Sequence, residues 1–365
     1  MNRISKIAIK GFKTLNDVEF EPGNLNVMIG PNGVGKSNFI SFFRMLNWML
    51  GSSKLEEHVA KQGGASKLLH DGADVTQQIE TYIRIESEGG GNDYKFRLAY
   101  AAGDTLVFVE EKYRYSRSDY DEPHPWNDLG VGHKESRMVD RANSDNIAKY
   151  LLNLLWQCKV FQFHNTSATA RIKEKWHISN FQYLKEDAAN LGPFLYNLKE
   201  NEPDSYRKIV ETLRLILPFF DDFYLEPAYD NFLLSWREKN SDVIFDASQA
   251  SDGMLRIFSL VTLLGQPVNT IPEILIIDEP ELGLHPFAIS LISDMIKSVS
   301  KHVQVIIATQ SVTFVDQFEP EDVIVVERNR RETEFNRLNT EGLKEWIGEY
   351  SLGDLWLMNR IGGRP

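Results

Sequence analysis

The stretch GPNGVGKS at residues 30–37 decides the fold. It follows the apolar run Leu25–Ile29, which has the composition of a buried strand, and it leads into Ser37–Leu50, whose apolar residues recur at helical spacing. The octapeptide fits the pattern G-x-x-x-x-G-K-[ST] of a loop that binds phosphate between a strand and a helix. Its glycines let backbone N–H groups surround an anion, and the helix directs the positive end of its dipole at the phosphates.

The residues of this loop have separate chemical tasks. We expect Lys36 to place a positive charge on the β- and γ-phosphates of a nucleotide, and Ser37 to offer its hydroxyl to Mg²⁺. The nucleotide-binding residues that the sequence predicts in and beside the loop are Asn32, Gly33, Val34, Gly35, Lys36, Ser37 and Asn38.

A second motif, ILIIDEP at residues 274–280, places two acids at the end of an apolar strand, where α/β sheets bind their ligands. Asp278 can hold Mg²⁺, often through water, and Glu279 can polarise an attacking water. The alternative for Glu279 is a helix cap or an ion pair. The phosphate loop earlier in the chain favours the catalytic interpretation.

The stretch SQASDGMLR at residues 248–256 contains a Ser-x-Gly turn that opens a helix. Such a turn is a second N-terminus able to bind an anion, although by itself it is an ordinary helix cap. Because Gly253 lies about 25 residues before Asp278, we interpret the turn as functional.

Composition limits the classes of protein that fit. The chain has 365 residues, 42% of them hydrophobic and 25% charged, as in ordinary globular proteins. The net charge of -12 disfavours a surface wholly devoted to nucleic acid. A basic cluster at Arg328, Arg330, Arg331 and Arg337 is either a solvated surface or a local groove. With one cysteine, Cys158, and no apolar run that could span a bilayer, we expect a soluble cytoplasmic protein.

The rest of the chain predicts its organisation. Residues 79–85, 94–100 and 105–115 alternate between apolar and polar side chains, which indicates an antiparallel meander. Residues 51–75 are rich in glycine and are predicted as loops, and residues 180–217 are predicted as helical.

Together these motifs resemble the ABC-type ATPases of the SMC/RecF/OLD group, in particular compact ATPases of bacterial defence and repair loci. The resemblance implies an α/β fold: an ABC-type ATPase head with a mixed central sheet, an antiparallel β subdomain and a short helical insertion. Neither a long coiled coil nor a Toprim nuclease domain is expected. The stretches that carry the resemblance are residues 7–15 (IAIKGFKTL), 30–37, 250–254 (ASDGM), 278–286 (DEPELGLHP) and 308–311 (ATQS).

The same resemblance implies how the chain is divided. Residues 1–365 form a single head, and its expected parts are a nucleotide-binding lobe with the β meander (1–50 and 78–165), a helical insertion (180–218), a lobe with the signature, Walker B and switch motifs (231–330) and a C-terminal docking segment (340–365). For the closing apolar, glycine-rich stretch, packing on the protein's own core is the alternative.

It also assigns roles to residues. Lys13 ends the first strand near the adenine, Glu279 and Gln310 are catalytic, and Gln162 joins Ser37 and Asp278 as a Mg²⁺ ligand. Gln162 has an alternative interpretation, as an incidental polar residue in a buried aromatic strand, and the neighbouring His164 is either a satisfied structural histidine or a metal ligand. Gln310 stands where the superfamily usually has histidine, so hydrolysis is expected to be slow.

The expected mechanism is dimeric. Two heads, in a homodimer or a higher even-numbered oligomer, would enclose two ATP molecules. The signature residues that act on the ATP of the other head are Ser251, Asp252 and Gly253. ATP would join the heads and hydrolysis would release them.

The leading hypothesis is an ATP-binding and hydrolysing switch subunit that controls a separate effector, a nuclease, in anti-phage defence or DNA maintenance. DNA or a phage component is a further expected partner, and a membrane is not. The alternatives are a repair ATPase that binds DNA directly and an ATP-binding scaffold without hydrolysis. A transporter ATPase is disfavoured by the long insertion between Lys36 and Ser251.

Overall fold

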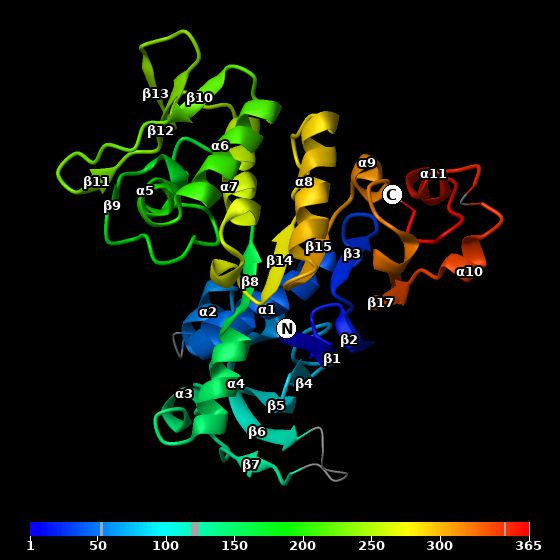
Figure 1. Cartoon of the computed structure of the whole chain (residues 1–365). Coiled ribbons are helices and arrows are strands. Elements are labelled where there is room, and N and C mark those ends of the chain that lie inside the picture. Colours follow the sequence, from blue (N-terminus) through cyan, green and yellow to red (C-terminus); the bar gives the residue numbers. More distant parts are fainter. Residues whose placement is uncertain (52–53, 118–123, 347, 365) are drawn as a thin grey trace. The chain divides into compact units, whose positions relative to one another are not determined.

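The computed structural model describes residues 1–51, 54–117, 124–346 and 348–364, which divide into two compact units (Figure 1). The first unit contains residues 1–160, 273–276 and 303–365, and the second contains residues 161–272 and 277–302. Among the described residues, no helix has both the length and the apolar character that crossing a bilayer requires.

The first unit contains an antiparallel sheet in the order β2-β1-β4-β5-β6-β7. It confirms the predicted meander, and its alternating apolar residues, such as Ile7 paired with Ile83, line the core. The strands are β1 (Arg3–Phe12), β2 (Leu15–Phe20), β4 (Gln78–Ser87), β5 (Gly90–Ala101), β6 (Thr105–Arg117) and β7 (Asn127–Asp128).

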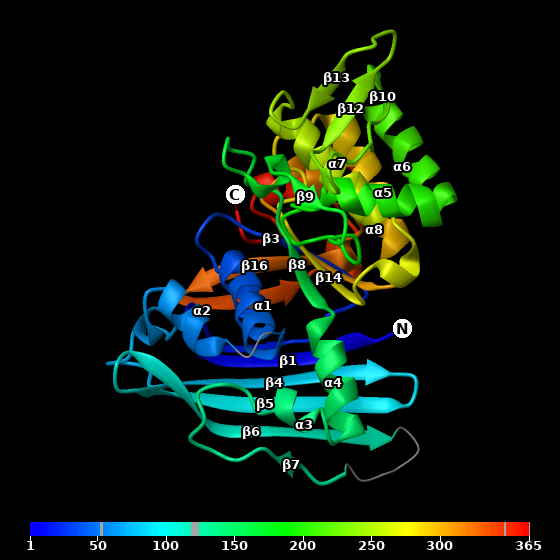
Figure 2. The same ribbon diagram turned by 90° about the vertical axis from the view of Figure 1, so that its left-hand side faces the viewer.

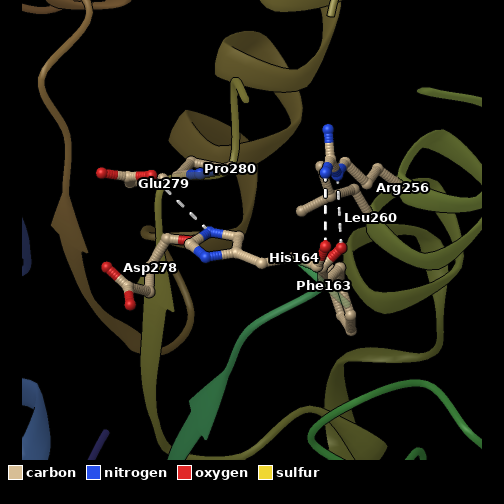
Figure 3. Close-up of a pocket in the computed structure, with 7 residues that line it drawn as sticks. All are labelled: Phe163, His164, Arg256, Leu260, Asp278, Glu279 and Pro280. Atoms are coloured by element: carbon tan, nitrogen blue, oxygen red, sulfur yellow. Dashed lines mark hydrogen bonds and ion pairs between the residues drawn. The ribbon is translucent and has the colours of Figure 1, made fainter. Parts of the chain in front are cut away.

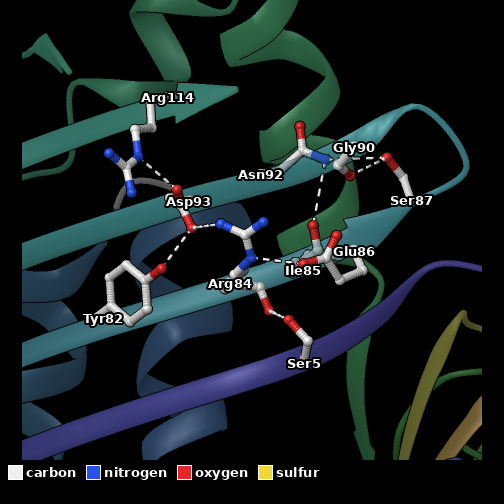
Figure 4. A network of polar contacts seen from close by, with 10 residues as sticks. All are labelled: Ser5, Tyr82, Arg84, Ile85, Glu86, Ser87, Gly90, Asn92, Asp93 and Arg114. Atoms are coloured by element: carbon white, nitrogen blue, oxygen red, sulfur yellow. Dashed lines mark hydrogen bonds and ion pairs between the residues drawn. The ribbon is translucent and has the colours of Figure 1, made fainter. Parts of the chain in front are cut away.

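A buried carboxylate, Asp93, fixes the register of three of these strands (Figure 4). It accepts hydrogen bonds from Tyr82 Oη at 2.6 Å, Arg84 at 3.3 Å and Arg114 Nε at 2.6 Å. Burial, together with the bond to Asp93, raises the pKa of Tyr82 to about 12. A buried charge is tolerated because it is paired and hydrogen-bonded, so slippage of β4, β5 or β6 would be costly.

A second, mixed sheet has the order β17-β16-β3-β15-β14-β8. Both β15 and β16 run parallel to β3, which is buried along its whole length as strands between parallel neighbours are. The strands are β3 (Leu25–Ile29), β8 (Cys158–Phe161), β14 (Ile274–Asp278), β15 (Gln304–Ala308), β16 (Val323–Asn329) and β17 (Glu332–Arg337).

Helix α1 (Lys36–Gly51) lies between the two sheets (Figure 2) and buries Phe39, Phe42 and Phe43 in one core with both of them. The prediction of loops over residues 51–75 was wrong in part, because α2 (Leu55–Lys61) forms there. Leu55 and Val59, four residues apart, bury the same face of that helix, and this contact outweighs the short length of the segment. Helices α3 (Met138–Arg141) and α4 (Asn146–Trp156) belong to the same unit.

The second unit packs helices around a small sheet of β10, β12 and β13. Phe258 of α7 contacts Phe220, Phe223 and Trp236, whose ring centroids lie 5.1 to 5.6 Å away. The helices are α5 (Leu191–Asn201), α6 (Pro203–Ile216), α7 (Asp252–Gly265) and α8 (Pro286–Val299). The strands are β9 (Trp176–His177), β10 (Phe220–Phe223), β11 (Asn231–Phe232), β12 (Ser235–Glu238) and β13 (Ile244–Asp246).

The helical prediction for residues 180–217 holds only from Leu191 onward. Residues 180–190 are irregular because the side chain of Asn190 occupies their backbone groups. Its amide donates to the carbonyls of Asn180 and Tyr183, and its oxygen accepts from Lys185 N. Side-chain bonds of this kind compete with a helical ladder.

Near the C-terminus, α9 (Val312–Val315), α10 (Thr340–Leu343) and α11 (Leu352–Leu357) belong to the first unit. Trp356 is fully buried, and its indole N–H donates to Gly363 O, while Leu357 and Met358 are exposed. Of the segment predicted to dock a partner, residues 347 and 365 lie outside the described residues.

Candidate nucleotide site

The phosphate loop joins β3 to α1 with three left-handed glycines. The φ angles of Gly30, Gly33 and Gly35 are 151°, 83° and 121°, values that other residues rarely adopt. A Cβ added at Gly33 would meet no heavy atom of the described residues within 4 Å, so this side of the loop is open. A Cβ at Gly35 would lie 2.0 Å from Thr333 Oγ1, so the opposite side is closed.

The loop fits a polyphosphate. Helix α1 begins at Lys36, so its first N–H groups and its dipole serve the loop. The Lys36 ammonium donates to the carbonyls of Gly30 and Pro31, the latter at 3.0 Å, which holds the charge over the loop. Ser37 is exposed at the start of the helix.

Gln310 follows β15 and belongs to the same unit as the loop. Because β15 runs parallel to β3 and Thr309 N donates to Met28 O at 3.0 Å, Gln310 lies at the edge of the sheet where the loop begins. Ser311 caps α9 immediately afterwards, with its Oγ accepting from Phe314 N at 3.2 Å. The structure thus brings together the loop and the predicted switch residue.

A chain of hydrogen bonds that the sequence does not reveal closes the back of the loop. Asn38 Nδ2 donates to Thr14 Oγ1 at 2.7 Å. The hydroxyl oxygens of Thr14 and Thr333 are hydrogen-bonded to each other at 2.7 Å, and Thr333 Oγ1 donates to Val34 O at 2.7 Å. No local sequence signal could identify Thr333, which lies about 300 residues from the loop.

Lys13 lies in the turn between β1 and β2 with a φ of 49°. Its ammonium donates to Ser41 Oγ of α1 at 2.7 Å. Burial lowers the pKa of Lys13, and the nearby charge of Arg44 lowers it further. The predicted contact between Lys13 and the nucleoside remains a prediction.

The two predicted acids belong to the second unit, at the end of β14. Asp278 is buried, and its Oδ2 accepts from Gln162 Nε2 at 2.8 Å, so two of the residues predicted to bind Mg²⁺ are in contact. Glu279 has a φ of 44°. A left-handed residue other than glycine costs on the order of 1–3 kcal/mol, and such strain concentrates at functional sites.

His164 lies beside both acids (Figure 3). Its Nε2 is 3.0 Å from Asp278 O and 3.9 Å from Glu279 Oε2, and its Nδ1 is 3.0 Å from Gln162 Nε2. A carbonyl only accepts, so Nε2 carries the proton and Nδ1 accepts from the amide. His164 is thus hydrogen-bonded at both ring nitrogens, but its interpretation as a structural histidine did not identify Asp278 as its partner.

Arg256 of α7 supports the same region from its other side (Figure 3). Its guanidinium donates to the carbonyls of Phe163 at 3.3 Å, His164 at 3.3 Å and Leu282 at 3.1 Å. Arg256, Phe163 and His164 line a pocket of about 180 Å³, with open solvent included, together with Leu260, Asp278, Glu279 and Pro280.

The signature turn lies at the start of α7 in this second unit. Ser251 is the N-cap, and its Oγ accepts from Met254 N at 3.3 Å. Gly253 lies in the first turn of α7, which begins at Asp252, so the predicted Ser-x-Gly turn does open this helix. Ser251 and Asp252 are exposed, so their polar groups face solvent in one copy.

The donors also suit Mg²⁺. This ion keeps most of its waters and binds through one or two protein oxygens and the phosphates of its substrate. The Ser37 hydroxyl of the first unit and the Asp278 carboxylate of the second are each, by themselves, an oxygen donor of that kind. Among the described residues there is no group of three or more His, Cys, Asp or Glu side chains that could form an all-protein cage.

Comparison with known families shows that residues 25–316 match a family model. The family is described as "AAA domain, putative AbiEii toxin, Type IV TA system". The match contains the phosphate loop, the signature turn, both acids and Gln310.

A curated relative is the OLD nuclease of Thermus scotoductus, 22% identical over 355 residues that make up 90% of this chain. The chain spans 62% of the length of that relative. Among solved structures, an Smc head bound to the C-terminal winged-helix domain of ScpA superposes with a TM-score of 0.60 at 16% identity, over 93% of this chain and 98% of the other.

An Smc head from Pyrococcus furiosus, bound to the C-terminal domain of ScpA, gives a TM-score of 0.57 at 14% identity, over 96% of this chain and 99% of the other. These findings confirm the predicted α/β fold class and the resemblance to the SMC/OLD group.

Proposed function

Because the chain belongs to the family described as "AAA domain, putative AbiEii toxin, Type IV TA system" and has the fold of SMC ATPase heads, we propose that it binds ATP with Mg²⁺ and hydrolyses it. The observation that carries this proposal is the phosphate loop. It is open at Gly33, it begins helix α1, and Lys36 is held over it by two backbone carbonyls.

Each residue then has a task in the reaction. Lys36 and the backbone N–H groups of the loop bind the β- and γ-phosphates. Ser37 and Asp278 would hold Mg²⁺, which would neutralise charge on the phosphate oxygens. Glu279 aligns the attacking water with the γ-phosphorus and accepts a proton from this water. Gln310 orients that water by hydrogen bonding, as an amide can without taking its proton.

We also propose that ATP joins two copies of the head. The exposed Ser251 at the N-terminus of α7 supports this, since an N-cap with free solvent access can meet the γ-phosphate bound by a second copy. Hydrolysis removes that contact and releases the heads, which makes the protein a switch. Its proposed output is control of a separate nuclease in defence or DNA maintenance, a role that the similarity to an OLD nuclease supports.

Direct binding of DNA by the Arg328–Arg331 turn is less well supported. Arg331 pairs with Asp71 at 2.7 Å, and Arg328 lies 3.4 Å from Gly33 O, so two of its guanidinium groups are engaged within the protein. DNA binding by the isolated protein that weakens with salt and is lost on substituting Arg330 would revive this alternative.

Release of phosphate from ATP tests the main proposal. The wild type should release phosphate with Mg²⁺ present, and Lys36→Ala should neither bind ATP nor release phosphate. Glu279→Gln should keep its affinity for ATP and lose at least about a hundredfold in rate. Equal background release by all three proteins would show that the chain is not a hydrolase.

A further inference from the structure

We propose that His164 is a positioning residue for hydrolysis: its Nε2–H holds the peptide between Asp278 and Glu279 and so aims the Glu279 carboxylate. The inference rests on the proposed ATPase function and adds a residue to it. It starts from three facts about the second unit: the contact of His164 with Asp278 O, the left-handed backbone of Glu279, and the anchoring of residue 164 by Arg256.

The hydrogen bond is made to the atom that controls the direction of Glu279. The Asp278 carbonyl belongs to the peptide plane that enters Glu279, and rotation of this plane changes the φ of Glu279. With a φ of 44°, Glu279 occupies a minor basin for residues with a side chain. A donor 3.0 Å from that carbonyl holds the plane in this basin.

The imidazole is held at both ring nitrogens, with Nε2 bound to Asp278 O and Nδ1 to Gln162, and the backbone of residue 164 is held as well. Gln162 Nε2 lies 3.0 Å from Nδ1 and fixes the tautomer. The same amide donates to Asp278 Oδ2 at 2.8 Å, which joins the ring to the proposed Mg²⁺ ligand. Arg256 holds the backbone of residue 164 through its carbonyl at 3.3 Å.

His164 therefore acts through Glu279 and need not touch the substrate. Its Nε2 is 3.9 Å from Glu279 Oε2, too far for a good hydrogen bond but close enough to limit where the carboxylate can lie. Removing the imidazole should free the peptide plane and spread the orientations of Glu279. This slows the chemical step and leaves the phosphate loop in the first unit unchanged.

Steady-state kinetics with matched variants test the proposal. His164→Ala should lower kcat about tenfold or more and leave KM and the Kd for ATP within about twofold. His164→Gln should restore most of kcat, because its amide N–H extends about as far as Nε2. His177→Ala is the control, since His177 is exposed in the same unit and should behave as the wild type.

The results separate this inference from the function on which it rests. A wild type with no release above Lys36→Ala would defeat the ATPase proposal itself. If the wild type is active and His164→Ala has the same kcat, the positioning role is wrong. So would a His164→Gln variant that stays folded by thermal unfolding and binds ATP normally yet remains as slow as His164→Ala.

Discussion

At the scale of single residues, the candidate site depends on groups in unfavourable states that their neighbours stabilise. Glu279 has a left-handed backbone, and Asp278 is a carboxylate with 8% relative exposure. Each has a hydrogen bond that offsets the cost: His164 at the carbonyl of Asp278 and Gln162 at its carboxylate. Such hydrogen bonds indicate that the positions of Glu279 and Asp278 are important for the candidate site.

His58 of α2 is a buried residue whose effect on stability depends on pH. It has 4% relative exposure, and burial, with the charges of Lys13 and Lys61, lowers its pKa from 6.5 to about 4. Its pKa is lower folded than unfolded, so the stability that depends on neutral His58 is complete above pH 6.5. This stability falls as the pH drops towards 4, because the unfolded chain takes up the proton more readily.

Between pH 7.5 and pH 5, His58 should account for a loss of about 2 kcal/mol in the free energy of unfolding. Urea unfolding of His58→Gln should show a smaller loss than the wild type by about that amount. His177→Gln, an exposed control, should follow the wild type. An equal loss in the wild type and His58→Gln would show that His58 does not titrate as its burial requires.

At the scale of elements, the hairpin of β16 and β17 supports the phosphate loop from behind. β16 runs beside β3, and Thr333 Oγ1 of β17 donates a hydrogen bond to Val34 O of the loop at 2.7 Å. Thr333 has 3% relative exposure, so its hydroxyl has little access to water. The loop is thus held between its own helix and a hairpin from the far end of the chain.

Thr333→Val should weaken ATP binding about tenfold, which corresponds to about 1.4 kcal/mol. The substitution keeps the volume of the side chain but removes the hydroxyl that donates to the Val34 carbonyl and meets Thr14. Calorimetric titration with ATP would measure the effect.

Two further variants are controls for the Thr333→Val measurement. Thr333→Ser keeps the hydroxyl and should bind ATP nearly as the wild type does, and Asn336→Ala, an exposed change on the same strand, should have no effect. Wild-type affinity in Thr333→Val would contradict the view that the hairpin positions the loop.

At the scale of the whole molecule, the proposed function requires two copies. With ATP and Mg²⁺, Glu279→Gln should become a dimer by light scattering, because nucleotide stays bound. Adding Ser251→Arg should keep the protein monomeric, since the longer charged side chain blocks the start of α7. A monomer in Glu279→Gln at saturating ATP would contradict the dimeric mechanism.

Mixing two inactive proteins gives a sharper test of the same prediction. A mixed dimer of Lys36→Ala and Ser251→Ala has one site with an intact loop from one copy and an intact Ser251 from the other, and alanine adds no bulk at the start of α7. Because one of the two sites in each mixed dimer works, part of the wild-type activity should return. Neither protein alone should show it, and a mixture as inactive as its parts would refute a shared site.

The sequence by itself determined the fold class and the chemical motifs. The phosphate loop, its strand and helix, and the acids after β14 depend on local patterns: apolar periodicity, glycines at left-handed positions and polar residues at strand ends. The structure confirms β3, the meander and α1 close to their predicted bounds. The sequence predicted less well where distant side chains override local preference, as at Asn190 and in α2.

Only the tertiary structure decided which residues support these motifs. Thr333 reaches the loop from about 300 residues away, and His164 reaches Asp278 from about 114 residues away. Such contacts depend on which strands become neighbours and in what register, which is set by packing of the whole core and leaves no periodic trace in the sequence. The motifs name the reacting groups, and the fold supplies the hydrogen bonds that hold them in place.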